Sequence, residues 1–210
     1  MKLLIADDHA IVREGLKQII SEIPEIDFID EASDGFDVFN KLKNENFQML
    51  LLDISMPGKS GLDVLKEVKD IYPNLPVLVL SVHSEEQYAK RVLRAGASGF
   101  IPKHADPDEL KSAIIKVMQG KKYISNHFAE ILADEISKTE TEDGYKTLSD
   151  REFQVFKLLA KGYSNKEISE RLFLSDKTVS TYKARIFEKM NISNNAELIK
   201  YAIKHNLLEE

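Results

Sequence analysis

The sequence predicts an α/β protein: a doubly wound, five-stranded parallel sheet of the flavodoxin-like type, followed by a small all-α domain of four helices. Two observations support this. Short apolar runs alternate five times with segments of helical periodicity in the first half of the chain, whereas the last third contains helical segments only. A length of 210 residues is also comfortable for two domains.

Each element of the first half follows from a local pattern. The apolar runs predict strands at 2–6, 27–32, 49–53, 77–81 and 99–101. The segments between and after them predict helices at 10–21, 35–45, 61–71, 85–95 and 107–119. Pro107 is a start signal for the last of these helices, and Gly120 is a stop signal. Strictly alternating strands and helices predict right-handed crossovers, with helices on both faces of the sheet.

Composition and charge narrow the class of protein. The chain has 43% hydrophobic and 30% charged residues, and it has no apolar stretch of the roughly 18 residues that a membrane span needs. We therefore expect no membrane partner. The N-terminus begins a strand directly and lacks a signal peptide, so we expect a cytoplasmic protein. The absence of cysteine excludes disulfides, thiol catalysis and cysteine-ligated metals.

Polar side chains stand where four of the predicted strands end. Asp7 and Asp8 end the first strand, Asp53 the third and Ser81 the fourth, and Lys103 follows the fifth. Because the carboxyl ends of parallel strands share one edge, these side chains should converge. Three carboxylates would repel one another without a cation, and oxygen-only ligands favour Mg²⁺ before Ca²⁺. A lysine and a hydroxyl beside the metal would suit the oxygens of a phosphoryl group.

This arrangement resembles the receiver domain of bacterial two-component response regulators. The resemblance covers residues 1–121 and rests on Asp7-Asp8-His9, the segment 52–61 around Asp53, Ser81, the segment 95–100 and Lys103. It implies that Asp53 accepts a phosphoryl group from a sensor histidine kinase in the presence of Mg²⁺. It also implies the metal ligands: Asp8 and Asp53 directly, Asp7 through water, and the backbone carbonyl of Ser55.

The same resemblance assigns roles around the phosphoryl group. Lys103 would pair with its oxygens, and Ser81 would move inward to hydrogen-bond one of them. Phe100 occupies the aromatic switch position, and the alternative for it is a plain core aromatic. His83 either shields the acyl phosphate or is an ordinary loop histidine. Lys103 is followed by His104 where many relatives have proline, so a cis X-Pro bond cannot be assumed there.

The predicted domain limits are 1–123 for the receiver, 124–146 for a linker and 147–210 for the C-terminal domain. An apolar stripe predicts a helix over 124–138, and an acidic, core-free stretch follows it. Lys and Arg number 16 against 20 Asp and Glu in the first segment, 2 against 6 in the second and 11 against 9 in the third. A mildly basic tail on an acidic chain is compatible with a nucleic-acid surface or with random variation.

The C-terminal domain has clear helix starts. Ser149 and Ser164 open capping boxes, Ser175 precedes a third helix, and Asn194 caps a fourth. Helices at 165–172 and 176–190 are separated by three residues only, which is the helix-turn-helix arrangement. Residues 147–210 resemble the LuxR-type helix-turn-helix of the NarL/FixJ family, through the segments 148–152, 164–168 and 174–179.

That resemblance implies a double-stranded DNA operator, with two half-sites, as partner. Residues matched to phosphate contacts are Lys177, Thr178, Tyr182 and Lys183. Residues matched to base edges are Ser180, Thr181 and Ala184, and Arg185 suits either role. Tyr182 stands where histidine is most common in the family. The last helix would form the contact of a homodimer on DNA once the chain is phosphorylated.

The resulting interpretation is a phosphorylation-controlled, DNA-binding transcriptional regulator that is not an enzyme beyond slow self-dephosphorylation. One alternative is a metal-dependent phosphohydrolase, but that class usually needs a second acid two residues after its nucleophile, where this chain has Ser55. Another is a constitutive DNA-binding protein whose receiver serves only for dimerisation. The complete set of acids, Ser81 and Lys103 favours the regulated protein.

Overall fold

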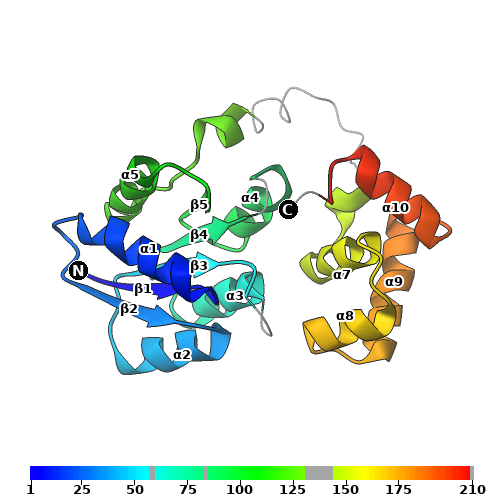
Figure 1. The fold of residues 1–210 in the computed structure, drawn as a ribbon, viewed down its shortest axis with the longest axis horizontal. Helices are drawn as coiled ribbons and strands as arrows, with labels where there is room; N and C mark the ends of the chain where they lie inside the picture. Colours follow the sequence, from blue (N-terminus) through cyan, green and yellow to red (C-terminus); the bar gives the residue numbers. More distant parts are fainter. Residues whose placement is uncertain (57–59, 83–84, 131–143, 209–210) are drawn as a thin grey trace. The chain divides into compact units, whose positions relative to one another are not determined.

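The computed structural model describes residues 1–56, 60–82, 85–130 and 144–208, apart from the side chains of 85–87. The chain divides into two compact units, Met1–Glu135 and Ile136–Glu210 (Figure 1). The predicted limits of the linker remain a prediction. Residues 126–130 are helical, as expected for the start of the 124–138 helix, and residues 131–143 lie outside the described part of the chain.

The first unit contains one parallel sheet of five strands. The strands are β1 (Lys2–Ala6), β2 (Phe28–Ala32), β3 (Met49–Asp53), β4 (Val77–Ser81) and β5 (Gly99–Pro102). Their order across the sheet is β2-β1-β3-β4-β5, and every pair is parallel. The predicted doubly wound sheet is therefore confirmed. This order makes β1 and β3 direct neighbours, so the chain segments that follow them start side by side.

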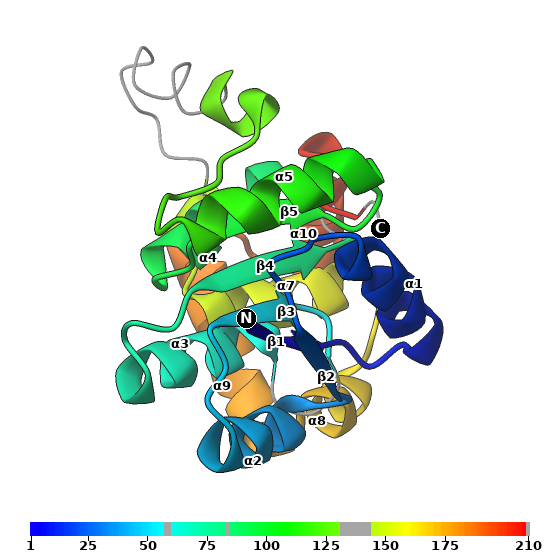
Figure 2. The same cartoon turned by 90° about the vertical axis from the view of Figure 1, so that its left-hand side faces the viewer.

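Helices cover both faces of the sheet. They are α1 (Ala10–Ser21), α2 (Gly35–Asn44), α3 (Gly61–Ile71), α4 (Glu85–Arg94) and α5 (Pro107–Met118). Figure 2 shows α1 and α3 on opposite sides of the sheet. The start and stop signals act as predicted: Pro107 is the first residue of α5, and Gly120 takes a left-handed conformation (φ 77°) just beyond its end.

Alternate residues of each central strand face opposite helical layers. Leu3, Ile5 and Leu51 pack in one core with residues of α1 and α5. Their neighbours Leu4 and Leu50 point the other way and are equally buried. Burial on both faces explains why the strands read as continuous apolar runs rather than as alternating ones. It also leaves the strand ends as the places where polar groups can gather.

Gly61 fixes how α3 approaches the end of β3. A Cβ atom at this position would overlap the carbonyl oxygen of Asp53 and would lie 2.6 Å from the Cα of Ile54. The Gly61 N–H donates to the carbonyl of Ile54 at 3.0 Å, and the Ser60 side chain accepts from Asp63 N–H to cap the helix. The backbone just after Asp53 is therefore clamped against α3 at a spot that only glycine permits.

The second unit is a bundle of short helices. It contains a 3₁₀ turn, η1 (Gly144–Thr147), and then α7 (Asp150–Ala160), α8 (Asn165–Leu172), α9 (Asp176–Met190) and α10 (Asn195–Lys204). Both predicted capping boxes form, at Ser149 and Ser164, and Ser175 and Asn194 cap the last two helices. The short connection between α8 and α9 confirms the predicted helix-turn-helix.

Contacts inside this unit fix α9. Val179 and Ile186 are fully buried, and Lys189 donates to Glu152 of α7, whose carboxylate is almost completely buried, at 2.6 Å. Burial disfavours the charged form of Glu152, but the hydrogen bonds from Lys189 and Ser149 outweigh it and lower its pKa. The η1 turn was not predicted: Gly144 lies against Met190, so the last residues of the predicted linker fold with this unit.

The substitution Gly61→Ala tests the clamp on β3. The added methyl group must displace the Asp53 backbone or α3, which should destabilise the first unit by about 1–3 kcal/mol in urea denaturation. Gly15→Ala is a matched control with the opposite sign. A Cβ at Gly15, inside α1, meets no atom within 4 Å, so alanine there should stabilise by about 0.5–1 kcal/mol. Equal effects of the two substitutions would contradict the clamp.

Candidate functional site

The carboxylates predicted to converge do so. Asp7, just after β1, and Asp53, the last residue of β3, are both 0% exposed, and the Asp8 side chain is 26% exposed. One oxygen from each carboxylate and a ring nitrogen of His9 all lie within 4.8 Å of one another. Adjacent parallel strands that end at the same level explain the cluster, because their following residues share one edge of the sheet.

Lys103 is the cation of this cluster. Its Nζ lies 2.6 Å from Asp7 Oδ2 and 2.8 Å from Asp53 Oδ2. The backbone places it, since the Lys103 N–H donates to the carbonyl of Ser81 at 2.8 Å. One lysine thus faces two buried carboxylates, with Asp8 beside them. Among the described residues, the carboxylates of this cluster outnumber its lysine unless another cation enters.

Backbone N–H groups hold the carboxylates in place. Asp53 Oδ1 accepts from Ser55 N–H at 3.0 Å, and Asp7 Oδ1 accepts from His9 N–H at 2.8 Å. Two other oxygens, Asp7 Oδ2 and Asp8 Oδ1, are buried but accept no well-directed hydrogen bond from the described residues. Lys103 Nζ and His9 Nδ1 lie within ion-pair distance of them. Buried carboxylate oxygens that accept no well-directed hydrogen bond are suited to bind a hard cation.

Burial and the lysine act on the Asp53 carboxylate in opposite directions. Burial raises the pKa of Asp53, and the hydrogen bonds from Lys103 and Ser55 lower it without cancelling that effect. For Lys103, burial lowers the pKa, but the hydrogen bond to Asp53 and the close approach to the Asp7 carboxylate outweigh it, so the pKa is raised. The lysine therefore stays protonated, and ionised Asp53 is energetically costly until further positive charge is supplied.

The remaining predicted residues of the first unit lie near this edge. Ser81 ends β4 and is fully buried, and Phe100 of β5 is 2% exposed. Burial of Phe100 is compatible with a switch residue and with a core aromatic. The described residues contain no cis peptide bond. His83 lies outside the described residues.

Three residues at the site were not given a role from the sequence. His9 is the N-cap of α1, and its ring also lies 2.9 Å from Asp8 Oδ1. Arg13 donates to the carbonyl of Asp7 at 2.7 Å and to Glu31 at 2.7 Å. The spacing between Arg13 and Asp7 in the sequence does not indicate this contact. Gly61 could have been noticed as the glycine that follows the Asp53 loop.

The candidate DNA-binding residues all lie on α9. Lys177, Ser180, Thr181, Ala184 and Arg185 are exposed, and Thr178, Tyr182 and Lys183 are half-buried. The apolar side of the same helix, with Val179 and Ile186, faces the core. Lys183 Nζ lies 5.5 Å from the centre of the Phe187 ring, which supports its stem. The helix therefore presents one continuous polar face of small, hydroxylic and basic side chains.

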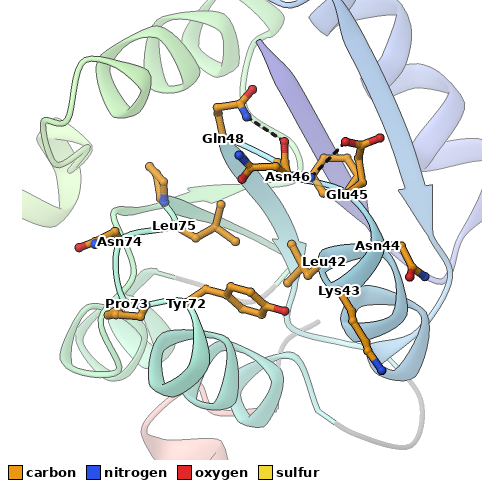
Figure 3. A pocket seen from close by; sticks show the side chains of 12 residues that line it. Leu42, Lys43, Asn44, Glu45, Asn46, Gln48, Tyr72, Pro73, Asn74 and Leu75 are labelled. Carbon is orange, nitrogen blue, oxygen red and sulfur yellow. Dashed lines mark hydrogen bonds between the residues drawn. The ribbon is translucent and has the colours of Figure 1, made fainter.

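A hollow of about 640 Å³ lies elsewhere in the first unit (Figure 3). Its walls come from the α2–β3 and α3–β4 segments, and Figure 3 shows Tyr72 reaching toward Leu42 and Lys43. These segments precede β3 and β4, so the hollow is at the amino ends of the strands, opposite the acidic cluster. It contributes no residue to that cluster. Among the described helices, none is long and apolar enough to cross a membrane.

Comparisons with known proteins agree with both units. Residues 3–115 match the family model for response regulator receiver domains, and residues 146–202 match that for bacterial regulatory proteins of the luxR family. The chain is 38% identical to the oxygen regulatory protein NreC of Staphylococcus carnosus and 37% identical to NreC of Staphylococcus epidermidis, with complete coverage of each chain.

A solved structure gives the same result. The chain is similar to RcsB from Salmonella enterica serovar Typhimurium, solved on the promoter rprA with the phosphomimetic BeF₃⁻. The TM-score is 0.70 at 29% identity, covering 96% of this chain and 98% of RcsB. The protein therefore belongs to the NarL/FixJ family of two-component response regulators, in which a receiver domain is joined to a LuxR-type DNA-binding domain, and this is a family of transcription factors rather than of enzymes.

Proposed function

We propose that Asp53 accepts a phosphoryl group from a sensor histidine kinase, and that this modification controls binding of the C-terminal domain to DNA. The observation that carries the proposal is the position of Lys103, whose ammonium lies within 3 Å of both buried carboxylates, Asp7 and Asp53. A lysine shared by two carboxylates can pair with the oxygens of a phosphoryl group on Asp53, because its ammonium already lies 2.8 Å from Asp53 Oδ2.

The acidic cluster also fits a magnesium site. Asp8 and Asp53 would bind the ion directly, Asp7 through water, and the backbone carbonyl of Ser55 would complete the protein ligands. Support comes from the two buried oxygens, on Asp7 and Asp8, that accept no well-directed hydrogen bond from the described residues. When bound, Mg²⁺ supplies positive charge to the phosphoryl oxygens and to the cluster.

Several residues of the chain would act in turn during phosphoryl transfer. One oxygen of the Asp53 carboxylate attacks phosphorus, a P–O bond forms, and the P–N bond to the donor imidazole breaks with the electron pair leaving on nitrogen. Lys103 then pairs with the phosphoryl oxygens. Ser81 turns to donate its hydroxyl to one of them, and Phe100 moves into the space that Ser81 leaves. Because Ser81 and Phe100 are on neighbouring strands, one movement can follow the other.

The DNA-binding half of the proposal concerns α9. Lys177, Thr178, Tyr182 and Lys183 would contact phosphates, whereas Ser180, Thr181 and Ala184 would face base edges and Arg185 would serve either role. Small hydroxylic side chains fit a major groove without steric overlap. RcsB, a similar protein, was solved on promoter DNA. By analogy the partner is a double-stranded operator with two half-sites, bound by a homodimer in the cytoplasm.

Phosphoryl transfer is tested with a small phosphodonor and Mg²⁺ on the full chain. Phos-tag electrophoresis and intact mass should show one phosphoryl group on the wild type, none on Asp53→Asn, and normal labelling of the surface control Asp70→Asn. Only the ionised carboxylate attacks. Burial raises the pKa of Asp53 in the metal-free protein, and Mg²⁺ would lower it by adding positive charge, so the pH midpoint of the labelling rate should fall as the Mg²⁺ concentration is raised. Labelling of Asp53→Asn equal to that of the wild type would refute the assignment.

The phosphate-contact role of Lys183 predicts a specific response to salt. Lys183→Ala should weaken binding to specific and unrelated duplexes alike, and it should reduce the slope of log K against log salt by about one unit, because one fewer counterion is released. Lys204→Ala, which removes an exposed lysine from the end of α10, is the control and should leave the slope unchanged. A loss of sequence discrimination at constant salt slope would instead assign Lys183 to base contact.

A further inference from the structure

We propose that two neighbouring hydroxyl groups on α9 differ in polarity: Ser180 presents chiefly a hydrogen-bond donor to DNA, whereas Thr181 presents acceptors only. The inference deepens the proposed function and rests on α9 entering the major groove. It concerns which class of base edge each residue selects. Both polarities follow from hydrogen bonds within the second unit.

Asn165 sets the polarity of Ser180. Asn165 is the first residue of α8, and its amide Nδ2 donates to Ser180 Oγ at 3.1 Å. A serine hydroxyl has one proton to donate and two lone pairs that accept. Since the amide occupies one lone pair from the side of α8, the hydroxyl proton and the second lone pair are directed away from Asn165. The oxygen already accepts one hydrogen bond, so donation of the proton is what completes its pairing. Ser180 is exposed, so this proton is available to an acceptor on the DNA.

Thr181 has the reverse arrangement. Its Oγ1 donates to the carbonyl of Lys177, one turn earlier in α9, at 2.9 Å. The hydroxyl proton is therefore used inside the helix, and the exposed side chain offers only oxygen lone pairs and a methyl group. Consecutive residues of the same helix thus offer a donor and an acceptor.

These polarities select different base edges. In the major groove guanine offers N7 and O6 as acceptors, adenine N7 and thymine O4, and these suit the outward proton of Ser180. Cytosine N4 and adenine N6 offer amino protons, which suit the lone pairs of Thr181, and the thymine methyl suits its methyl group. The two residues should therefore favour opposite classes of base at two positions of each half-site. Without such fixed hydroxyls, serine and threonine would accept either class.

Asn165→Asp is the sharpest test of this inference. A carboxylate cannot donate, so the Ser180 hydroxyl should turn inward and donate to it, and its lone pairs would then face the groove. An acidic residue is also favourable in the first turn of a helix, so α8 should be retained. The added charge will weaken binding to every sequence. Asn195→Asp is the matched control, since Asn195 is likewise the first residue of its helix, α10.

The measurement is selection from a randomised duplex pool with the full phosphorylated chain, followed by sequencing and by dissociation constants for the selected duplexes. For Asn165→Asp, preference at one position per half-site should move from acceptor-bearing to donor-bearing bases, a change of roughly tenfold in the ratio of affinities. Asn195→Asp should keep the wild-type preferences. Ser180→Ala should flatten preference at the same position, and Thr181→Val should do so at a second position.

Two outcomes overturn the inference. In one, Asn165→Asp and Asn195→Asp both weaken binding but leave the base preference unchanged. The Asn165 contact would then only hold α8 against α9. In the other, Ser180→Ala and Thr181→Val leave all preferences intact. Failure of the proposed function looks different, because the wild type itself would then show no preference for any duplex.

Discussion

The ion pairs between Lys103 and two buried carboxylates, Asp7 and Asp53, are the interaction on which the first unit depends. Burial of Asp7 and Asp53 side by side is costly, and Lys103 supplies one positive charge for two negative ones. The strand order makes β1 and β3 adjacent, and the end of β5 delivers the lysine. Because the charge is unbalanced, a cation or the proposed modification of Asp53 would change the electrostatic energy of the whole edge.

Two contacts hold the described backbone at this edge. Gly61 allows α3 to press on the carbonyl of Asp53, and Arg13 holds the carbonyl of Asp7. Contacts within the second unit likewise fix the positions of its polar groups. Capping boxes and the Lys189–Glu152 contact fix the helices, and hydrogen bonds from Asn165 and to Lys177 orient two exposed hydroxyls. In both units, hydrogen bonds and ion pairs within the unit decide what the polar groups of the candidate site can do.

Much of the fold and of the acidic cluster could be predicted from the sequence. Apolar runs and caps depend on neighbouring residues, so strands and helices such as α1, α3 and α9 were placed to the residue. The acid cluster was predictable because strand-end residues of a parallel sheet share an edge. The roles of Gly61 and Arg13 were not, since they arise from approaches between distant segments. The η1 turn carries no periodicity, and it forms because Gly144 packs on Met190.

The central claim is that the buried acids require a cation. Its most direct test is the melting temperature of the full chain with and without MgCl₂, at constant ionic strength. A cation that binds only the folded receiver should stabilise it by roughly 2.7 kcal/mol at a hundred times its dissociation constant. The wild type and Asp70→Asn should therefore melt at a higher temperature with Mg²⁺, and Asp8→Asn should lose most of the increase. Identical increases in wild type and Asp8→Asn, or none in either, would contradict the account.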